Sequence, residues 1–266
     1  MQTRALKGPV AVGCGRPGFH SGAGLSRLRH TYYGILSSME APLSVAAADG
    51  CYEAARAAAL SGVPKSTMYW WARQGIVVPS VSPVQEKLWS YSDLMCLRIV
   101  SWLRHPKAAP HGAELPANPM SQVRRALVLL ERRGLDLWAP DSPGHSPILV
   151  DAAGAIFVRS DGEILDLHEQ PALLPEGRLE LTMPFRQDGV EGPNLLRPRP
   201  HLRIVPAKVA GEPHIADTRL TTQSVAALAA RGFSSERIAD MYASPVESIN
   251  EAIDLERQLM AVPAIA

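Results

Sequence analysis

The chain has 266 residues, of which 46% are hydrophobic and 20% charged, and its formal net charge is +1. This length allows two modest domains of ordinary globular composition. No run of about 18 apolar residues occurs, so the sequence predicts no membrane span. The near-zero charge excludes a globally cationic nucleic-acid-binding body.

Residues 1–38 contain five basic residues and no acidic one, and they are rich in glycine with little hydrophobic periodicity. We predict that this segment is a disordered amino-terminal extension. An arginine-bearing start without acids also suits a transit peptide, but Met39 begins a more ordinary sequence, which favours an upstream extension. Residues 39–266 hold 22 basic residues (27 less five) and all 26 acidic ones, a net charge of −4. DNA binding would therefore need a local basic face.

Residues 51–75 predict two short helices joined by one tight turn. Gly62 suits the end of the first helix, and Pro64 suits the first turn of the second. Helical spacing places the apolar side chains of Met68, Trp71 and Ala72 on the inward side of the second helix. The opposite side carries basic and hydroxyl groups, as contacts to bases and phosphates require: Lys65, Ser66, Tyr69 and Arg73. An ordinary helical hairpin with a solvated face is the alternative.

The next residues predict a small β wing. Residues 76–79 and 87–91 are two short extended pieces around a Ser/Pro-rich tip. Ser92 and Asp93 then supply capping groups for a third helix, predicted over 94–104.

This order of helix, turn, helix, wing and helix resembles the MerR-type winged helix-turn-helix. The residues that match its motif are Glu53, Ala54, Ala55, Gly62, Val63, Ser66, Thr67, Met68, Trp71, Gly75, Tyr91, Ser92, Asp93 and Leu94. The resemblance implies a DNA-binding domain over 39–134 and a homodimer that reads a two-fold operator. The candidate DNA contacts are Lys65, Ser66, Thr67, Tyr69 and Arg73, with Lys87 of the wing on the phosphate backbone.

The sequence predicts no metal site, cofactor or catalytic residue. Cys14, Cys51 and Cys96 are odd in number and widely spaced, which favours neither a disulfide framework nor a zinc site and fits a reducing cytoplasm. Metal-sensing MerR proteins carry clustered cysteines, and this chain does not. The zinc-protease, nucleophile-elbow and Walker A motifs are all missing, so we do not expect an enzyme.

The middle of the chain predicts one helix followed by a small antiparallel sheet. The helix, over 121–133, either packs back on the DNA-binding module or forms a dimer contact. The hydrophobic period then becomes two in a 147–196 connector, with Asp161-Gly162 as a hairpin turn. The expected strands are 148–150, 155–159, 163–167 and 178–183. We interpret this sheet as a scaffold, with binding of a ligand or partner strand as the alternative.

Residues 197–266 predict a carboxy-terminal domain. A stiff basic linker precedes two short strands, and three helices follow, of which Thr222 caps the first and Ser234 the second. In the second helix, Ile238, Met241 and Tyr242 are predicted to point inward. The fold class is therefore mainly α with small β elements (α+β).

These residues resemble a small domain family long described as of unknown function. The matching residues are His201, Arg203, Ile204, Gly211, Pro213, Ile215, Thr218, Arg219, Gly232, Ser234, Glu236, Ile238 and Tyr242. Two residues depart from the pattern: Leu202 replaces a proline, and Asp217 replaces a glycine, although Asp tolerates positive φ better than most residues. The resemblance implies a VapB-type antitoxin, whose partner is a PIN-domain ribonuclease of the VapC type.

The leading hypothesis is thus a cytoplasmic antitoxin that binds operator DNA and neutralises a PIN-domain ribonuclease. A PIN active site is a cluster of carboxylates around Mg²⁺, which arginine side chains could enter. The candidates are Arg197, Arg199, Arg203 and Arg219. The alternative is a one-component transcription regulator that responds to a small molecule.

Overall fold

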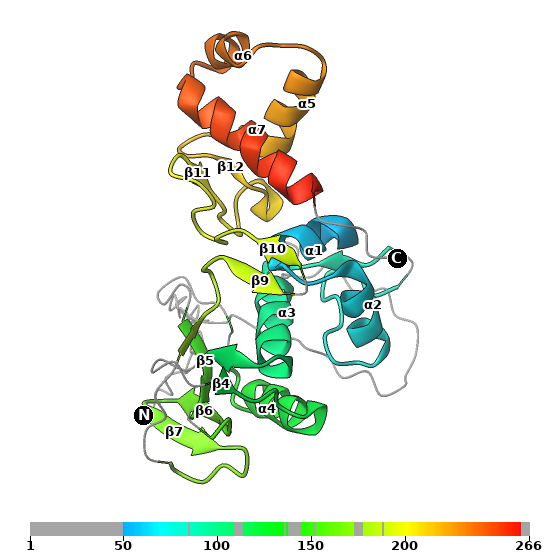
Figure 1. The fold of residues 1–266 in the computed structure, drawn as a ribbon, viewed down its shortest axis with the longest axis vertical. Coiled ribbons are helices and arrows are strands. Elements are labelled where there is room, and N and C mark those ends of the chain that lie inside the picture. The colour runs from blue at the N-terminus through cyan, green and yellow to red at the C-terminus, as the bar shows by residue number, and fades with distance from the viewer. Residues whose placement is uncertain are drawn as a thin grey trace, which may run out of the picture.

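The structure, a computed structural model, describes residues 50–84, 86–108, 114–135, 137, 145–151, 153–172, 178–187 and 189–261. The predicted extension over 1–38 lies outside these residues. The fold is α+β, as predicted. Figure 1 shows an elongated molecule in three parts: a sheet with helix α4 at one end, helices α1, α2 and α3 in the middle, and helices α5, α6 and α7 at the other end.

The predicted helix pair is confirmed as α1 (Ala54–Ser61) and α2 (Lys65–Arg73). Gly62 ends α1 with a φ of 73° and donates its N–H to the carbonyl of Ala58. A Cβ on Gly62 would lie 2.5 Å from the carbonyl oxygen of Phe185. The turn therefore requires glycine both for its backbone angle and for the close approach of a second segment.

The wing differs from the prediction. The second strand, β2 (Leu88–Trp89), pairs with β1 (Tyr52–Glu53), which lies directly before α1. The strand expected at 76–79 is wrong, because Ile76 and Val77 are buried in the core and form no ladder. Among the described residues, the only β-bridge within the wing joins Ser82 and Leu88. These two residues exchange two backbone hydrogen bonds.

Helix α3 (Tyr91–Arg104) begins three residues earlier than predicted, because its N-cap is Ser90 and not Ser92. Asp93 is the N3 residue of a capping box, in which each of the two side chains accepts the other residue's backbone N–H. The tyrosine that follows the cap, Tyr91, donates its hydroxyl to the carbonyl of Leu195.

Arg98, on α3, is fully buried and joins three segments of the middle part. Its five N–H groups reach five backbone carbonyls at 2.6–3.1 Å. Burial lowers the pKa of its guanidinium to about 9, so the group stays charged at neutral pH and the carbonyls satisfy it. The acceptors are Leu60 and Ser61 at the end of α1, and Leu181, Met183 and Pro193.

Two β hairpins flank these helices. The pair β9 (Phe185–Gln187) and β10 (Val190–Gly192) packs on α1.

The pair β3 (Lys107–Ala108) and β4 (Glu114–Leu115) follows α3. The ammonium of Lys107 is buried and donates to three carbonyls and to the Asn118 side chain, which closes the connection to the next helix.

The predicted helix and sheet of the middle residues are confirmed. Helix α4 (Met120–Arg132) packs on an antiparallel sheet of order β7-β6-β5-β8. The turn at Asp161 and Gly162 has φ angles of 51° and 84°, as a two-residue hairpin requires. The strands are β5 (His145–Val150), β6 (Ile156–Ser160), β7 (Glu163–Asp166) and β8 (Arg178–Glu180).

The carboxy-terminal part contains a two-stranded arm, β11 (Leu202–Arg203) and β12 (His214–Ile215), with a 3-10 turn, η2 (Val209–Gly211), between them. Asp217 has a φ of 60°, which explains how it replaces glycine. The three predicted helices are α5 (Thr222–Ala230), α6 (Ser235–Tyr242) and α7 (Val246–Met260).

Two details of this part correct the sequence prediction. Thr221, not Thr222, is the N-cap of α5, while Thr222 is buried and bonds the carboxylate of Glu256. Met241 and Tyr242, the last two residues of α6, are 47% and 44% exposed, whereas Ile238 is buried as predicted.

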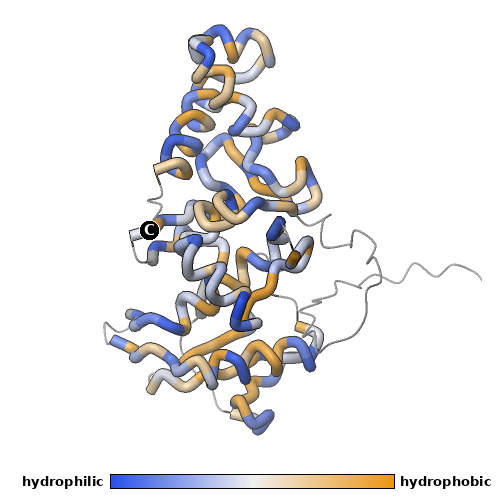
Figure 2. Tube along the Cα trace, turned by 90° about the vertical axis from the view of Figure 1, so that its right-hand side faces the viewer, coloured by the Kyte–Doolittle hydropathy of each residue, from blue (hydrophilic) through white to orange (hydrophobic). Residues whose placement is uncertain are grey.

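A junction ties the carboxy-terminal part to α1. Arg56 of α1 donates to Glu212 and to Glu256 of α7 at 2.7–2.9 Å, and all three side chains are largely buried. The N–H of Cys51 also donates to the carbonyl of Ala210. One cluster of buried side chains accordingly runs from Tyr52 to Leu259. Figure 2 shows polar and apolar residues alternating along the helices that enclose it.

Candidate nucleic-acid interface

The outward face of α2 is the candidate site. Met68 and Trp71 are buried against the rest of the module, as predicted. Because successive residues of an α-helix turn by about 100°, Ser66 and Arg73 point almost directly away from this buried side, and both are exposed. They form the centre of the face.

Lys65 and Tyr69 lie together on one flank of this face. The Lys65 ammonium stands 5.8 Å from the centroid of the Tyr69 ring, one helical turn away. A cation held over an aromatic ring loses part of its conformational freedom before it meets a ligand. The pair therefore presents a positioned positive charge beside a phenolic hydroxyl.

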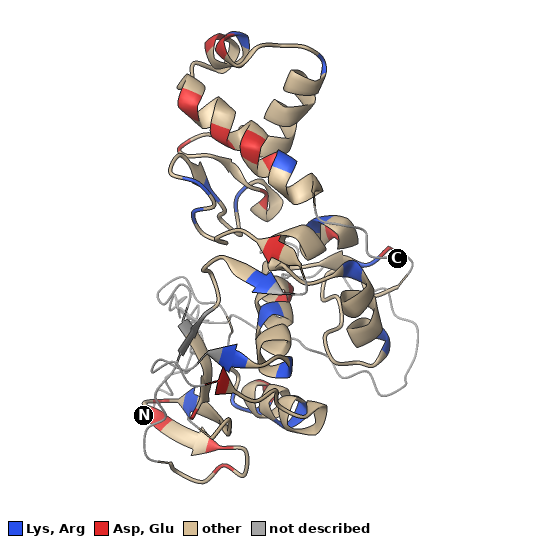
Figure 3. Ribbon diagram, viewed as in Figure 1, with Lys and Arg blue, Asp and Glu red and all other residues tan. Residues whose placement is uncertain are grey.

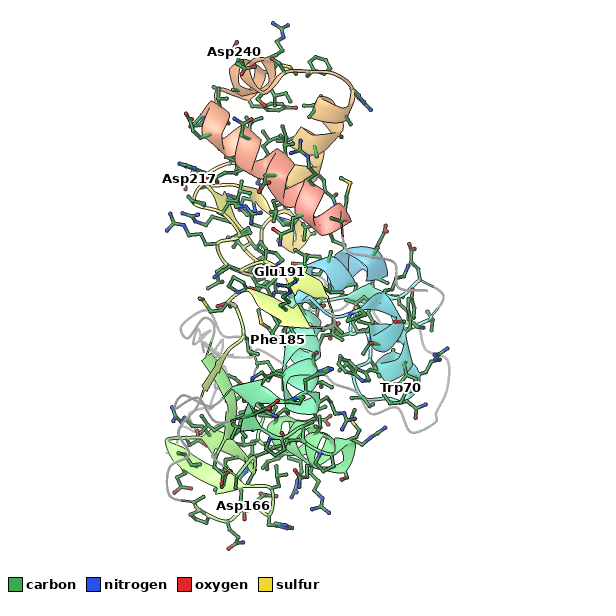
Figure 4. The ribbon with its side chains drawn as sticks, viewed as in Figure 1. Trp70, Asp166, Phe185, Glu191, Asp217 and Asp240 are labelled. Atoms are coloured by element: carbon green, nitrogen blue, oxygen red, sulfur yellow. The ribbon has the colours of Figure 1, made fainter. Side chains whose placement is uncertain are left out.

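Trp70 occupies the other flank and was missed by the sequence analysis. It lies about 50° from the centre of the face, opposite Tyr69, and its side chain is 46% exposed. Figure 4 shows it on the outer side of α2. Its spacing from Ser66, at i+4, was the available signal. Thr67 turns toward the buried side and is half-buried, so it contributes least to the face.

Lys87 lies on the wing, as predicted, but its ammonium is engaged within the loop. It donates to the carbonyls of Pro83 and Val84 at 3.0 and 3.4 Å. These bonds hold the tip, where Val84 is 72% exposed. The Lys87 ammonium is therefore partly engaged by the wing itself.

The four arginines predicted to meet a toxin are placed differently from one another. Arg199 forms an ion pair with Asp254 at 2.8 Å and donates to Gln258. Arg197 and Arg203 both donate to the carbonyl of Pro200. Arg219 is exposed after the Asp217 turn, and no described residue forms a hydrogen bond or ion pair with its guanidinium. Three of the four are therefore partly committed to contacts within the chain.

Figure 3 shows how charge is distributed over the molecule: basic residues occur on α2 and α4, and acidic residues are frequent on α6 and α7. Within the described residues, no group of three or more histidine, cysteine or acidic side chains could hold a metal ion. Cys96 is buried and Cys51 half-buried, both with free thiols. None of the helices in the described ranges is long and apolar enough to cross a membrane.

The comparisons with known proteins concern the carboxy-terminal residues most directly. Residues 203–254 match a family model described as protein of unknown function (DUF433). This match confirms the resemblance of those residues to a family of unknown function. An X-ray crystal structure of Rv2018 from Mycobacterium tuberculosis is similar at 17% identity, with a TM-score of 0.42, over 76% of this chain and 96% of that chain. None of the curated proteins matches the chain.

Proposed function

We propose that this protein is a VapB-type antitoxin that binds operator DNA through α2 and neutralises a PIN-domain ribonuclease. The outward face of α2 carries the DNA-binding half of the proposal. It combines two cations, two hydroxyls and an exposed indole on one side of a short helix whose other side is buried. Such a face can contact phosphates and base edges together.

The amino-terminal end of α2 also favours the binding of a DNA phosphate. Its N-cap, Pro64, provides no side-chain acceptor for the first N–H groups of the helix. Free N–H groups and the positive end of the helix dipole attract phosphate, and Lys65 stands at the same end. A phosphate at this position would therefore meet both backbone donors and an ammonium group.

The test is a gel-retardation titration with the DNA upstream of the protein's own gene. Replacing both Lys65 and Arg73 by Ala should weaken binding by about a hundredfold or more, since each contact is typically worth 1–3 kcal/mol or about one unit of salt slope. Arg237→Ala, on the distant helix α6, is the matched control. Equal affinity of the double variant and the native chain would refute the assignment of α2.

The antitoxin half rests on the resemblance of residues 201–242 to a family associated with toxin–antitoxin operons. It is tested by co-expression with the product of the neighbouring gene. A stable complex with a PIN-domain ribonuclease, and loss of its RNA cleavage in that complex, is the expected result. Dose-dependent thermal stabilisation by a metabolite, without such a partner, would favour a ligand-responsive regulator.

Among the four arginines predicted to contact the toxin, Arg219 is the strongest candidate. Its guanidinium is exposed, and it can meet a carboxylate without first giving up a described contact. Arg199 would have to release Asp254 and Gln258. The Arg219→Ala variant should therefore weaken toxin inhibition more than Arg199→Ala.

A further inference from the structure

Two arginines of the carboxy-terminal part converge on one backbone carbonyl. Arg197 donates from Nε and Nη2 to the Pro200 oxygen at 3.2 and 3.0 Å, and Arg203 donates from Nη1 to the same oxygen at 3.0 Å. Because one nitrogen of each guanidinium lies 3.0 Å from a shared oxygen, the two nitrogens are at most twice that distance apart. We call Arg197 and Arg203 the guanidinium pair.

The charge of the guanidinium pair is not neutralised by any described residue. Residues 197–208 contain four basic side chains and no acidic one. The two carboxylates that do contact this segment, Asp254 and Glu251, bind Arg199 and His201 instead. A carbonyl oxygen satisfies an N–H group but carries no net charge, so two cations remain close together without a counter-ion. Such cations repel each other, and a bound anion would relieve this repulsion.

Each guanidinium of the pair also keeps unused hydrogen-bond donors. Arg203 donates from Nη1 a second time, to the carbonyl of Leu202 at 2.7 Å. Since a guanidinium has five N–H groups and each arginine uses two, three remain on each. The remaining groups include one parallel pair on each side chain, at Nη1 and Nη2 of Arg197 and at Nε and Nη2 of Arg203. Arg197 is exposed and Arg203 half-buried, so solvent reaches both.

The backbone holds the guanidinium pair in place. The Asn194 side chain accepts the N–H of Arg197 at 2.7 Å, and the prolines at 198 and 200 fix the φ angles that follow. Arg203 lies in β11 and pairs with His214 of β12. Groups that are already positioned lose less conformational freedom when a ligand binds. The pair is therefore prepared for a small anion.

We propose that the guanidinium pair binds a phosphate group with two negative charges, either inorganic phosphate or the phosphate of a monoester. Such a group has two charges and at least three acceptor oxygens, which suit two cations with one two-donor fork each. A carboxylate has one charge and two oxygens, which a single fork satisfies. Figure 1 places β11 in the carboxy-terminal part and α2 in the middle part, so this site is separate from the proposed DNA-binding face. The inference goes beyond the proposed function and does not depend on it.

The experiment titrates the full chain with inorganic phosphate at pH 7.5 and follows binding by phosphorus NMR. The variant Arg197→Gln/Arg203→Gln should bind phosphate at least about tenfold more weakly, because it loses both charged forks. Arg219→Gln is the matched control, since Arg219 is an exposed arginine outside the pair, and it should keep native affinity. All three proteins should unfold at the same temperature, which excludes a loss of folding as the cause.

A second variant separates charge from hydrogen-bond geometry. Arg197→Lys/Arg203→Lys keeps both charges but removes the planar forks, so its affinity should fall between those of the native chain and the glutamine variant. Acetate at the same ionic strength tests the anion in the same way. It should bind to the native chain at least about tenfold more weakly than phosphate.

Two further probes distinguish the sources of the phosphate group. Glucose 6-phosphate represents a small monoester, and a single-stranded oligonucleotide with a 5′-phosphate represents a nucleic-acid end. Tighter binding of one of them, lost in the glutamine variant, identifies the source and supports the site. Equal phosphate affinity of the native chain and the glutamine variant, equal binding of acetate, or no binding of phosphate would overturn the inference. The gel-retardation and co-expression experiments decide the proposed function separately.

Discussion

The hydroxyl of Tyr52 donates a 2.7 Å hydrogen bond to the carbonyl of Gly211, 159 residues further along the chain. This bond joins the strand before α1 to the carboxy-terminal part, and the fit around it is close. A Cβ on Gly211 would overlap the Tyr52 hydroxyl, and Gly211 has a φ of 76°. The contact thus fixes how the carboxy-terminal part sits on the helix pair.

Gly211→Ala should open this junction. Gly232 offers a matched control, since its φ is 91° but nothing lies within 4 Å of the position of its Cβ. Both variants have the backbone strain of a non-glycine residue at positive φ, but only Gly211→Ala adds the overlap with Tyr52. We expect it to lower the free energy of unfolding by about 2 kcal/mol more than Gly232→Ala, the usual cost of overpacking. Urea denaturation measures both, and equal losses would show that the junction is loose.

Arg56→Ala should destabilise the same junction by removing its charge. It would leave the carboxylate of Glu256, whose side chain is 4% exposed, without its cationic partner. Losing one partner of a buried pair costs about 3 kcal/mol. Arg199→Ala breaks an exposed pair with Asp254 and should cost less than about 1 kcal/mol. If calorimetry gives the same small loss for both variants, the Arg56 network contributes little.

Much of this architecture was predictable from the sequence, because it depends on local rules. The helix pair follows from Gly62 and Pro64, and the sheet follows from period-two runs and the Asp161-Gly162 turn. The errors were of two kinds. Ser90 was assigned to the strand predicted over 87–91, but it is the N-cap of α3. Only the hydrogen bond that its hydroxyl accepts from the Asp93 N–H identifies this role. The wing strand pairs with Tyr52, across a helix pair, which no local pattern encodes.

Part of the candidate site on α2 was also predictable, because it depends on local helical spacing. Lys65, Ser66, Tyr69 and Arg73 follow from helical spacing within nine residues. Trp70 did not, because a tryptophan next to the buried Trp71 suggests core. Met241 and Tyr242 were predicted to face inward together with Ile238, but only Ile238 is buried. An amphipathic pattern gives the direction of a side chain but not how completely its neighbours cover it.

Trp70→Ala should weaken operator binding without changing stability. In the proposed complex, the exposed indole would contact a thymine methyl group beside the bases assigned to Ser66 and Arg73. A good base contact is worth about 1–3 kcal/mol, or about tenfold in affinity. Replacing thymine by deoxyuridine in the operator should produce a similar loss with the native chain but little further loss with Trp70→Ala. Independent, additive losses in this double cycle would show that Trp70 does not touch a methyl group.

Stability should decline in mild acid through His214. Burial lowers the pKa of this imidazole, and the neighbouring charges of Lys208 and Arg203 act in the same direction. The unfolded chain, with an imidazole pKa of about 6.5, therefore takes up a proton before the folded chain does. Stability is then lost as the pH falls through that value. His214→Gln should flatten this slope in thermal melts from pH 7.5 downward, and an unchanged slope in that variant would show that other groups cause the loss.

Arg98→Lys should loosen the middle part even though it conserves the charge. The guanidinium uses all five N–H groups on five carbonyls, whereas an ammonium has three donors on a single nitrogen and cannot reach the same acceptors. At least two buried carbonyls lose their partner, and each unsatisfied group costs about 1–3 kcal/mol. We expect a loss of at least about 2 kcal/mol by urea denaturation, against a small loss for Arg104→Lys, which gives up a single carbonyl bond at Asn118. Faster amide exchange in β9 and β10, which are attached to α1 beside Arg98, should accompany it, and native exchange there would show that the hairpin is held by other contacts.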